Sequence, residues 1–310
     1  MQHSKVSPFL SIVFSCLFLI IFCQEGLGQK VMRDKKLQSS LESLVKGYKG
    51  KVAIYVYHLK TGIEAEINAD TIFPTASIVK VPILIGIFDK IDKGELSYHQ
   101  PLIYNDSIQY GGSGMMQFFK DSTGTELSFL TSLMISYSDN TASLWNQALA
   151  GGGENINTLL ENYGFEATRV NSRTPEREKI WEKYGWGQTS PREMATLLVK
   201  IRNGEIISQA ASERMYRLMT NIYYDEYALS QVPPYIQTAS KQGMVDASRS
   251  ELVMVNAPHG DYVFYIATKD NQDQRWEHDN ESWVMMRTIS SFLWNYFEPR
   301  SEWVPPTPIP

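Results

Sequence analysis

The chain has 310 residues and a mildly acidic balance, with 29 lysines and arginines against 34 aspartates and glutamates. No run of positive charge is present to follow a phosphate backbone, so the composition argues against a nucleic-acid partner. The five histidines are scattered without metal-ligand spacing, so we expect no metal site and no cofactor. The length suits one large domain or two closely packed ones.

The amino-terminal segment is typical of a secretory signal peptide. His3 and Lys5 precede an apolar run over residues 9–22, which is shorter than a membrane-spanning helix needs. Small residues in Gly26-Leu27-Gly28 then form a cleavage site before Gln29. We expect residues 1–28 to be removed and the protein to be periplasmic or secreted.

Retention of this segment as a membrane anchor is the alternative. Both cysteines, Cys16 and Cys23, lie within it. A cleaved chain would therefore contain no disulfide, no thiol nucleophile and no cysteine metal site.

After this segment the chain alternates between helical and strand patterns. Apolar residues recur at helical spacing over residues 31–46, which predicts an amphipathic helix. Residues 51–58 are rich in β-branched and aromatic side chains, residues 60–62 form a turn, and residues 63–68 alternate apolar and polar. Together these three segments predict a β-hairpin.

The middle of the chain is predicted to be helical, with glycine-rich joints at residues 111–114 and 151–153. Ser190 and Glu193 form a capping box that begins a helix, with proline at its first position. Residues 169–189 between these features are polar and have no clear period. A loop of that length in a compact domain is usually functional.

Strand patterns return after residue 234, at residues 235–242, 251–256 and 262–269, and a last helix is predicted over residues 282–297. The outer parts of the chain therefore join most simply into one antiparallel sheet covered by the terminal helices.

We predict an α/β (α+β) fold with a discontinuous sheet domain and an inserted helical domain. The sheet domain takes residues 29–72 and 223–310, and the helical domain takes residues 73–222.

Ser77 and Lys80 carry the first candidate chemistry. They lie one helical turn apart in an apolar segment that reads as the opening of a buried helix. A serine hydroxyl needs a neighbouring base to attack, and burial makes a neutral lysine amine accessible. Ser43 and Lys46 repeat this spacing on a charged surface helix, and we interpret that second match as chance.

Two further motifs follow in order. Ser138-Asp139-Asn140 comes after an apolar run, and Lys241-Gln242-Gly243 closes a predicted strand. The chain thereby resembles the class A β-lactamases and related penicillin-recognising serine hydrolases, whose pattern is Ser-x-x-Lys, Ser-Asp-Asn and Lys-Thr/Ser-Gly. Lys60-Thr61-Gly62 also matches the third motif, but it precedes Ser77 and lies in a hairpin turn.

The resemblance implies a β-lactamase-like fold and a role for each matching residue. Ser77 is the acylated nucleophile, Lys80 is its base, and Ser138 delivers a proton to the departing nitrogen beside Lys241. Asn140 binds the substrate's amide side chain.

The same resemblance assigns an oxyanion hole to the backbone N–H groups of Ser77 and Met244, next to Gly243 of the third motif. Arg249 is a candidate for binding a substrate carboxylate, and Tyr110 is a candidate for the cleft mouth. A surface salt bridge and simple packing are their respective alternatives.

Two departures from the family pattern matter. The family's loop glutamate, which activates the deacylating water, is replaced by Thr174, and Glu176 is the nearest carboxylate that could take over as a catalytic group. Gln242 also replaces the small hydroxyl residue of the third motif. Acylation is therefore expected to be intact and deacylation slow.

The implied function is hydrolysis of a small-molecule β-lactam by a monomer that needs no cofactor. Two alternatives stay open: a cell-wall D,D-peptidase or esterase of the same fold, and a penicillin-binding sensor domain that stays acylated. The missing loop glutamate favours these alternatives, whereas the lack of a second apolar span argues against a receptor-type sensor.

Overall fold

The structure is a computed structural model that describes residues 32–305, which belong to one compact unit. The predicted signal peptide and its two cysteines lie outside the described residues. Within the described part of the chain, no helix combines the length and hydrophobicity needed to cross a bilayer.

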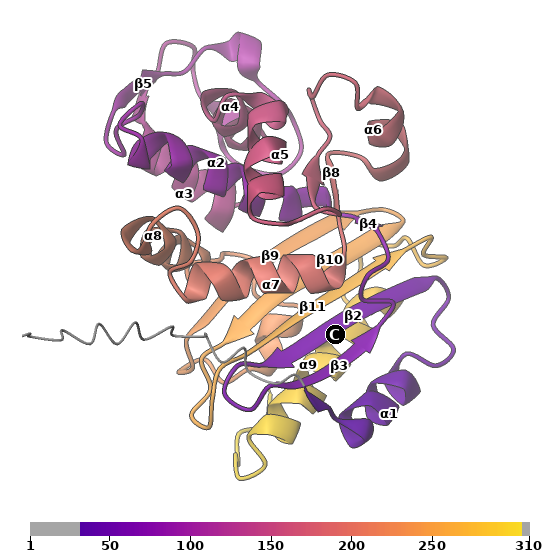
Figure 1. Cartoon of the computed structure of the whole chain (residues 1–310). Coiled ribbons are helices and arrows are strands. Elements are labelled where there is room, and N and C mark those ends of the chain that lie inside the picture. The colour runs from indigo at the N-terminus through magenta and orange to yellow at the C-terminus, as the bar shows by residue number, and fades with distance from the viewer. Residues whose placement is uncertain (1–31, 306–310) are drawn as a thin grey trace, which may run out of the picture. The chain divides into compact units, whose positions relative to one another are not determined.

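A six-stranded sheet organises these residues (Figure 1), in the order β1-β3-β2-β11-β10-β9. All neighbouring strands are antiparallel except the short β1, which runs parallel to β3. The strands are β1 Met32–Arg33, β2 Lys51–His58, β3 Ile63–Ile67, β9 Thr238–Val245, β10 Ser248–Val255 and β11 Tyr262–Lys269. The predicted sheet is thus confirmed, with β1 as an addition.

Alternation along the strands gives the sheet two buried faces. Ile54 and Phe264 belong to the core cluster under α1 and α9, whereas Tyr55 and Tyr265 belong to the cluster shared with α7 and the insert. The flanking helices are α1 Lys35–Leu44, α7 Pro191–Arg202, α8 Gln209–Met219 and α9 Glu281–Phe297. The predicted cover of terminal helices is therefore confirmed.

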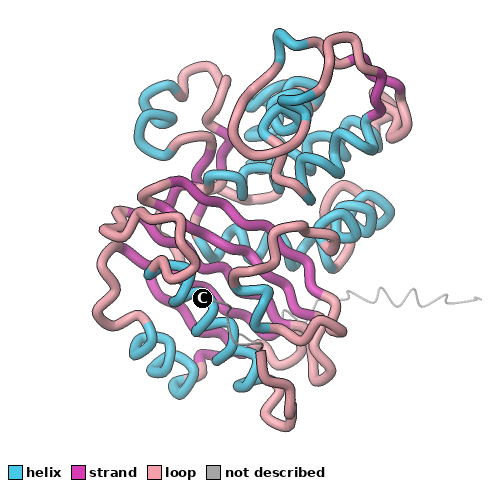
Figure 2. The backbone as a smooth tube through the Cα atoms, turned by 180° about the vertical axis from the view of Figure 1, so that it is seen from behind, coloured by secondary structure: helices cyan, strands magenta, loops and turns pink. Residues whose placement is uncertain are grey.

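The inserted segment is mainly helical, as expected, and Figures 1 and 2 show its helices gathered beyond one edge of the sheet. Its helices are α2 Lys80–Asp92, α3 Leu127–Ser136, α4 Asn140–Leu149, α5 Gly152–Asn162 and α6 Glu178–Tyr184. Short strands connect them: β4 Phe73–Pro74, β5 Pro101–Ile103, β6 Gly124–Glu126, β7 Arg169–Val170 and β8 Gly187–Thr189. The division into two domains stays a prediction.

The expected strand boundaries near the third motif are wrong. β9 continues to Val245 and β10 already begins at Ser248, so Gly243 lies within a strand and does not close it. A β-hairpin needs only two connecting residues, here Asp246 and Ala247, so both strands extend further toward each other than predicted. The longer strands place Lys241 in the interior of β9.

Candidate active site

Ser77 lies in a 3₁₀ turn, Ala76–Val79, that runs directly into α2. The expected helix therefore begins later than predicted, at Lys80. Three residues complete one 3₁₀ turn, so the side chains of Ser77 and Lys80 eclipse each other. Lys80 Nζ consequently lies 2.9 Å from Ser77 Oγ.

The Lys80 amine is the centre of the site. Besides Ser77 Oγ, Nζ contacts Ser138 Oγ at 3.1 Å, the Ser138 carbonyl oxygen, and Asn140 Oδ1 at 2.9 Å. The side chain is fully buried. Burial, and secondarily the charge of Lys241, holds the pKa of Lys80 well below its usual range. The amine can therefore lose its proton and act as a base.

Lys241 approaches the same serine from β9. Its Nζ lies 3.1 Å from Ser138 Oγ and donates to the Gln242 carbonyl oxygen at 3.1 Å. Burial lowers the pKa of Lys241 to about 7, although the charge of Glu251 opposes that shift. Ser138 Oγ thus lies between two buried amines, which is the arrangement needed to pass a proton.

Asp139 fixes this part of the site. One carboxylate oxygen caps α4 by accepting from Ala142 N at 2.8 Å, and the other accepts from Met115 N and Met116 N at 2.6 and 2.8 Å. Gly114 makes the approach possible, because a Cβ there would lie 2.3 Å from the Asp139 carboxyl group. The acidic residue therefore anchors the glycine-rich joint and leaves proton transfer to its neighbours.

Gly243 brings the sheet to the nucleophile. β9 is the last strand of the sheet and packs against the turn that carries Ser77. A Cβ on Gly243 would meet the Thr75 carbonyl oxygen at 2.2 Å, so only glycine permits this approach. Met244, the next residue, lines the cleft beside Ser77.

Two hollows meet at Ser77, and both also include Asn140 and Met244. The first, of about 570 Å³, is lined additionally by Lys51, Lys183 and Lys269, and we call it the lysine-bearing hollow. The second, of about 440 Å³, is lined additionally by Ser138, Gln242, Tyr224, Tyr227 and Trp276, and we call it the aromatic hollow.

Tyr110 borders the cleft, and its role in substrate binding stays a prediction. It lines the lysine-bearing hollow, is 42% exposed, and meets the Trp186 ring edge-on at a centroid distance of 5.2 Å. The alternative of simple packing does not account for that exposure.

The loop over residues 169–189 borders the cleft, and it is more ordered than its sequence suggested. β7, α6 and β8 lie within it, and Lys183 to Trp186 line the lysine-bearing hollow. Its entry is held by Glu193, whose carboxylate accepts from the backbone N–H groups of residues 166–168 at 2.7 to 2.8 Å. Ser190 caps α7 as expected, because its side chain accepts from the Glu193 N–H. The Glu193 side chain, however, binds the loop entry and not the backbone of Ser190.

The structure does not bring Glu176 to the site. It is exposed and lines neither hollow. Thr174 is buried against Gly153 of α5, and its hydroxyl donates to the Ser172 carbonyl oxygen at 3.1 Å. The loop instead presents Trp186, whose ring centroid lies 5.9 Å from Lys80 Nζ.

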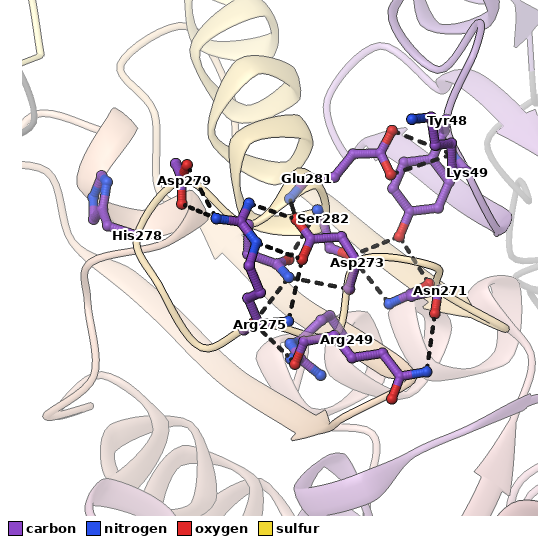
Figure 3. A network of polar contacts seen from close by, with 12 residues as sticks. Tyr48, Lys49, Arg249, Asn271, Asp273, Arg275, His278, Asp279, Glu281 and Ser282 are labelled. Carbon is purple, nitrogen blue, oxygen red and sulfur yellow. Dashed lines mark hydrogen bonds and ion pairs between the residues drawn. The ribbon is translucent and has the colours of Figure 1, made fainter.

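The expected carboxylate-binding role of Arg249 is wrong. Its guanidinium group is buried and donates to backbone carbonyl oxygens of the hairpin turn and of residues 274 and 275. It also lies 4.4 Å from the Trp276 ring centroid. Figure 3 shows Arg249 among the loop residues at the start of α9. The planar fork that suits a carboxylate suits clustered carbonyl groups equally well, and the sequence does not distinguish the two.

Several residues that line the hollows were not found from the sequence. Trp186, Tyr224, Tyr227, Trp276 and Lys269 come from loops and a strand that share no motif. Gln242 carried a signal, because it departs from the family pattern. Among the described residues, no cluster of histidine, cysteine or carboxylate side chains is arranged to hold a metal ion.

Comparisons with known proteins agree with this geometry. A family model described as "Beta-lactamase enzyme family" matches residues 36–297. "Beta-lactamase VEB-1" of Pseudomonas aeruginosa is 21% identical over 303 residues, which cover 94% of this chain and 98% of the relative.

Among solved structures, PBP-A has a TM-score of 0.77 and 25% identity, covering 87% of this chain and 98% of its own. A β-lactamase from Sphaerobacter thermophilus has a TM-score of 0.75 and 20% identity, covering 88% and 100%. Since the family model spans most of the chain, including all three motifs, this protein belongs to the β-lactamase enzyme family.

Proposed function

We propose that this protein is a serine hydrolase that opens the β-lactam amide through an acyl-Ser77 intermediate. One observation carries the proposal: the fully buried Lys80 amine lies within hydrogen-bonding distance of both Ser77 Oγ and Ser138 Oγ. Membership of a β-lactamase family favours this activity over the D,D-peptidase, esterase and sensor alternatives.

In the acylation step, neutral Lys80 accepts the Ser77 hydroxyl proton as Ser77 Oγ bonds to the carbonyl carbon. The developing oxyanion is placed between the backbone N–H groups of Ser77 and Met244. The carbon–nitrogen bond then breaks as Ser138 donates its proton to the nitrogen. Ser138 recovers a proton from Lys80, so the relay returns to its starting state.

Deacylation is the slow step in this proposal. Water must attack the ester, and a carboxylate placed to activate that water contributes roughly a hundredfold or more. The hollows around Ser77 contain one carboxylate, Asp270, which is paired with Lys51 at 2.7 Å. We therefore expect a long-lived acyl-enzyme.

Intact-mass measurement with benzylpenicillin and a chromogenic cephalosporin tests this function. The expected result is a covalent adduct on Ser77, located by peptide mapping, with slow release of the opened product. An adduct on Ser43 or Ser138 would contradict the assignment. Ser77→Ala should remove both adduct and turnover.

Glu176→Gln tests the loop's contribution separately. A catalytic Glu176 requires the loop to move, and the adduct would then persist longer in this variant. An unchanged adduct lifetime would remove Glu176 from the mechanism.

The location and assembly of the protein complete the proposal. We propose a periplasmic or secreted monomer, released by cleavage after residue 28, whose β-lactam hydrolysis would contribute to antibiotic resistance. A small-molecule substrate follows from the family.

A further inference from the structure

We propose that the aromatic hollow binds an uncharged portion of the substrate on its amine side, where the Gln242 side-chain amide recognises a carbonyl oxygen. This inference rests on the proposed acyl-serine chemistry and defines its substrate class. It concerns the part of the molecule attached to the scissile nitrogen, not the acyl part bonded to Ser77.

The position of Ser138 decides which part of the substrate enters this hollow. Ser138 lines the aromatic hollow and does not line the lysine-bearing hollow. Since its hydroxyl delivers the proton to the departing nitrogen, the substituents of that nitrogen must extend into the hollow that Ser138 borders. The acyl side chain is left with the lysine-bearing hollow on the other side of Ser77.

The aromatic hollow lacks the charge that a carboxylate needs. None of its lining residues is charged. Arg249 lies behind Trp276 and is already bound to backbone carbonyl groups, and the Lys241 amine is turned to Ser138 and Gln242. A carboxylate removed from water without a paired cation is strongly disfavoured.

Gln242 supplies a specific hydrogen-bond donor in its place. The residue is 4% exposed, and its Oε1 accepts from Lys241 Nζ at 3.4 Å. That contact leaves Nε2 as the free end of the amide, and Nε2 has no hydrogen-bond partner within the described residues. A buried N–H without a partner is costly, so an acceptor supplied by the substrate is favoured.

The neighbour of Gln242 across the sheet supplies no cation for an anionic acceptor. Glu251 is paired directly across from Gln242 on β10, so both side chains lie on the same face of the sheet. Glu251 is fully buried, and burial raises its pKa to about 8. It brings no positive charge to a substrate carboxylate, whereas a neutral ester or amide carbonyl satisfies Nε2 without one.

The aromatic side chains define the rest of the ligand. Tyr224, Tyr227 and the 55%-exposed Trp276 present flat apolar surface next to the amide. Such a surface suits an aryl or alkyl group. The substrate class is therefore a cyclic or open amide whose nitrogen side carries an uncharged ester or amide carbonyl flanked by apolar atoms.

Benzylpenicillin and its methyl ester form a matched pair that differs only at the group in question. The measurement is the second-order rate of Ser77 acylation by each, followed by intact mass. The unmodified protein should prefer the ester, and Gln242→Thr should shift the ester-to-acid rate ratio toward the acid by about tenfold, the effect of one buried hydrogen bond. Gln242→Met, which removes the donor without adding a charge, should shift the ratio in the same direction.

Gln272→Thr, at an exposed glutamine outside both hollows, should leave the ratio unchanged. Thermal unfolding of each variant identifies any that fail to fold, and Gln242→Met provides the test if Gln242→Thr does not fold. Preference for the acid in the unmodified protein, with a ratio that neither Gln242 variant moves, overturns the inference. A Ser77 that reacts with neither compound nor with a fluorophosphonate overturns the proposed function itself.

Discussion

The lysine-bearing and aromatic hollows share Ser77, Asn140 and Met244 but have opposite chemical character. One combines three lysines with a single aspartate, and the other contains no charged residue. The shared residues come from the catalytic turn, the second motif and β9. Most of the residues that distinguish the two hollows come from loops and strand ends elsewhere in the chain. The reacting centre and the choice of substrate are therefore built from separate parts of the chain.

The strongest way to break this comparison is to remove the base that serves both hollows. Lys80→Ala should lower Ser77 acylation by about a hundredfold or more for every substrate, whatever its charge, because the proton acceptor is lost. The measurement is the acylation rate, with circular dichroism to verify folding. Lys46→Ala, in the second Ser-x-x-Lys match, is the matched control and should have no effect. Acylation at the original rate would show that the proton relay is wrongly assigned.

Arg249→Met tests the claim that the buried Arg249 guanidinium group does not help to bind substrate in the aromatic hollow. It leaves several backbone carbonyl groups without a donor, so the free energy of unfolding should fall by about 3 kcal/mol. The ester-to-acid acylation ratio should stay constant. Chemical denaturation measures the first effect, with exposed Arg300→Met as control. A selective loss of reaction with the acid would return Arg249 to the substrate site.

Gly243→Ala tests the junction between the hollows. The added Cβ collides with the Thr75 carbonyl oxygen, so β9 and the catalytic turn must separate. We expect a loss of stability of about 1–3 kcal/mol and slower acylation. Gly124→Ala is the control, because a Cβ there meets no atom within 4 Å. Unchanged thermal unfolding and acylation in Gly243→Ala would show that the close approach is unnecessary.

Lys241→Met tests, through the pH dependence of acylation, whether Lys80 is the base shared by both hollows. The charge of Lys241 helps to lower the pKa of Lys80, so its removal should raise that pKa. Acylation requires neutral Lys80, and the rising limb of its pH profile should therefore move to higher pH. A shift to lower pH would mean that the titrating group is not Lys80.

Lys269→Met should give the smallest effect and should act on one hollow alone. Its amine is held in place by the Ile72 carbonyl oxygen at 2.7 Å and lies over the Phe73 ring. For penicillins with an anionic acyl side chain, we expect the acylation rate to fall by about threefold, and this loss should become smaller as salt screens the charge. For penicillins with a neutral acyl side chain, the rate should not change. Exposed Lys35→Met is the control. Equal losses for both penicillins would indicate a structural role.

The sequence was most informative where chemistry fixes local spacing. Ser77 and Lys80 are one turn apart in any helical conformation, so the motif alone predicts that their side chains lie close together. The order of strands and helices was also predictable, since hydrophobic periodicity reflects which face is buried. The position of Ser77 in a 3₁₀ turn, in contrast, depends on packing against β9.

The residues that line the walls of the cleft could not be predicted from the sequence, and the reason is physical. Trp276 and Tyr227 become neighbours of Gln242 only through the packing of loops onto the sheet, which leaves no periodic signal. Arg249 shows the opposite error, because an arginine suited to a ligand is equally suited to a turn. Glu193 likewise fits a capping box, and only the structure shows that it binds the loop entry.

The packing of the catalytic turn against the sheet has a consequence for self-association. The turn that carries Ser77 contacts both β9 and β10, and Gly243 allows it to approach closely. The same turn holds Ile78 and Val79 fully buried in the core that the sheet shares with the insert. Substitutions that separate the turn from the sheet should therefore expose apolar surface and promote aggregation as well as slow the reaction. Aggregation resistance and catalysis thus depend on the same contact.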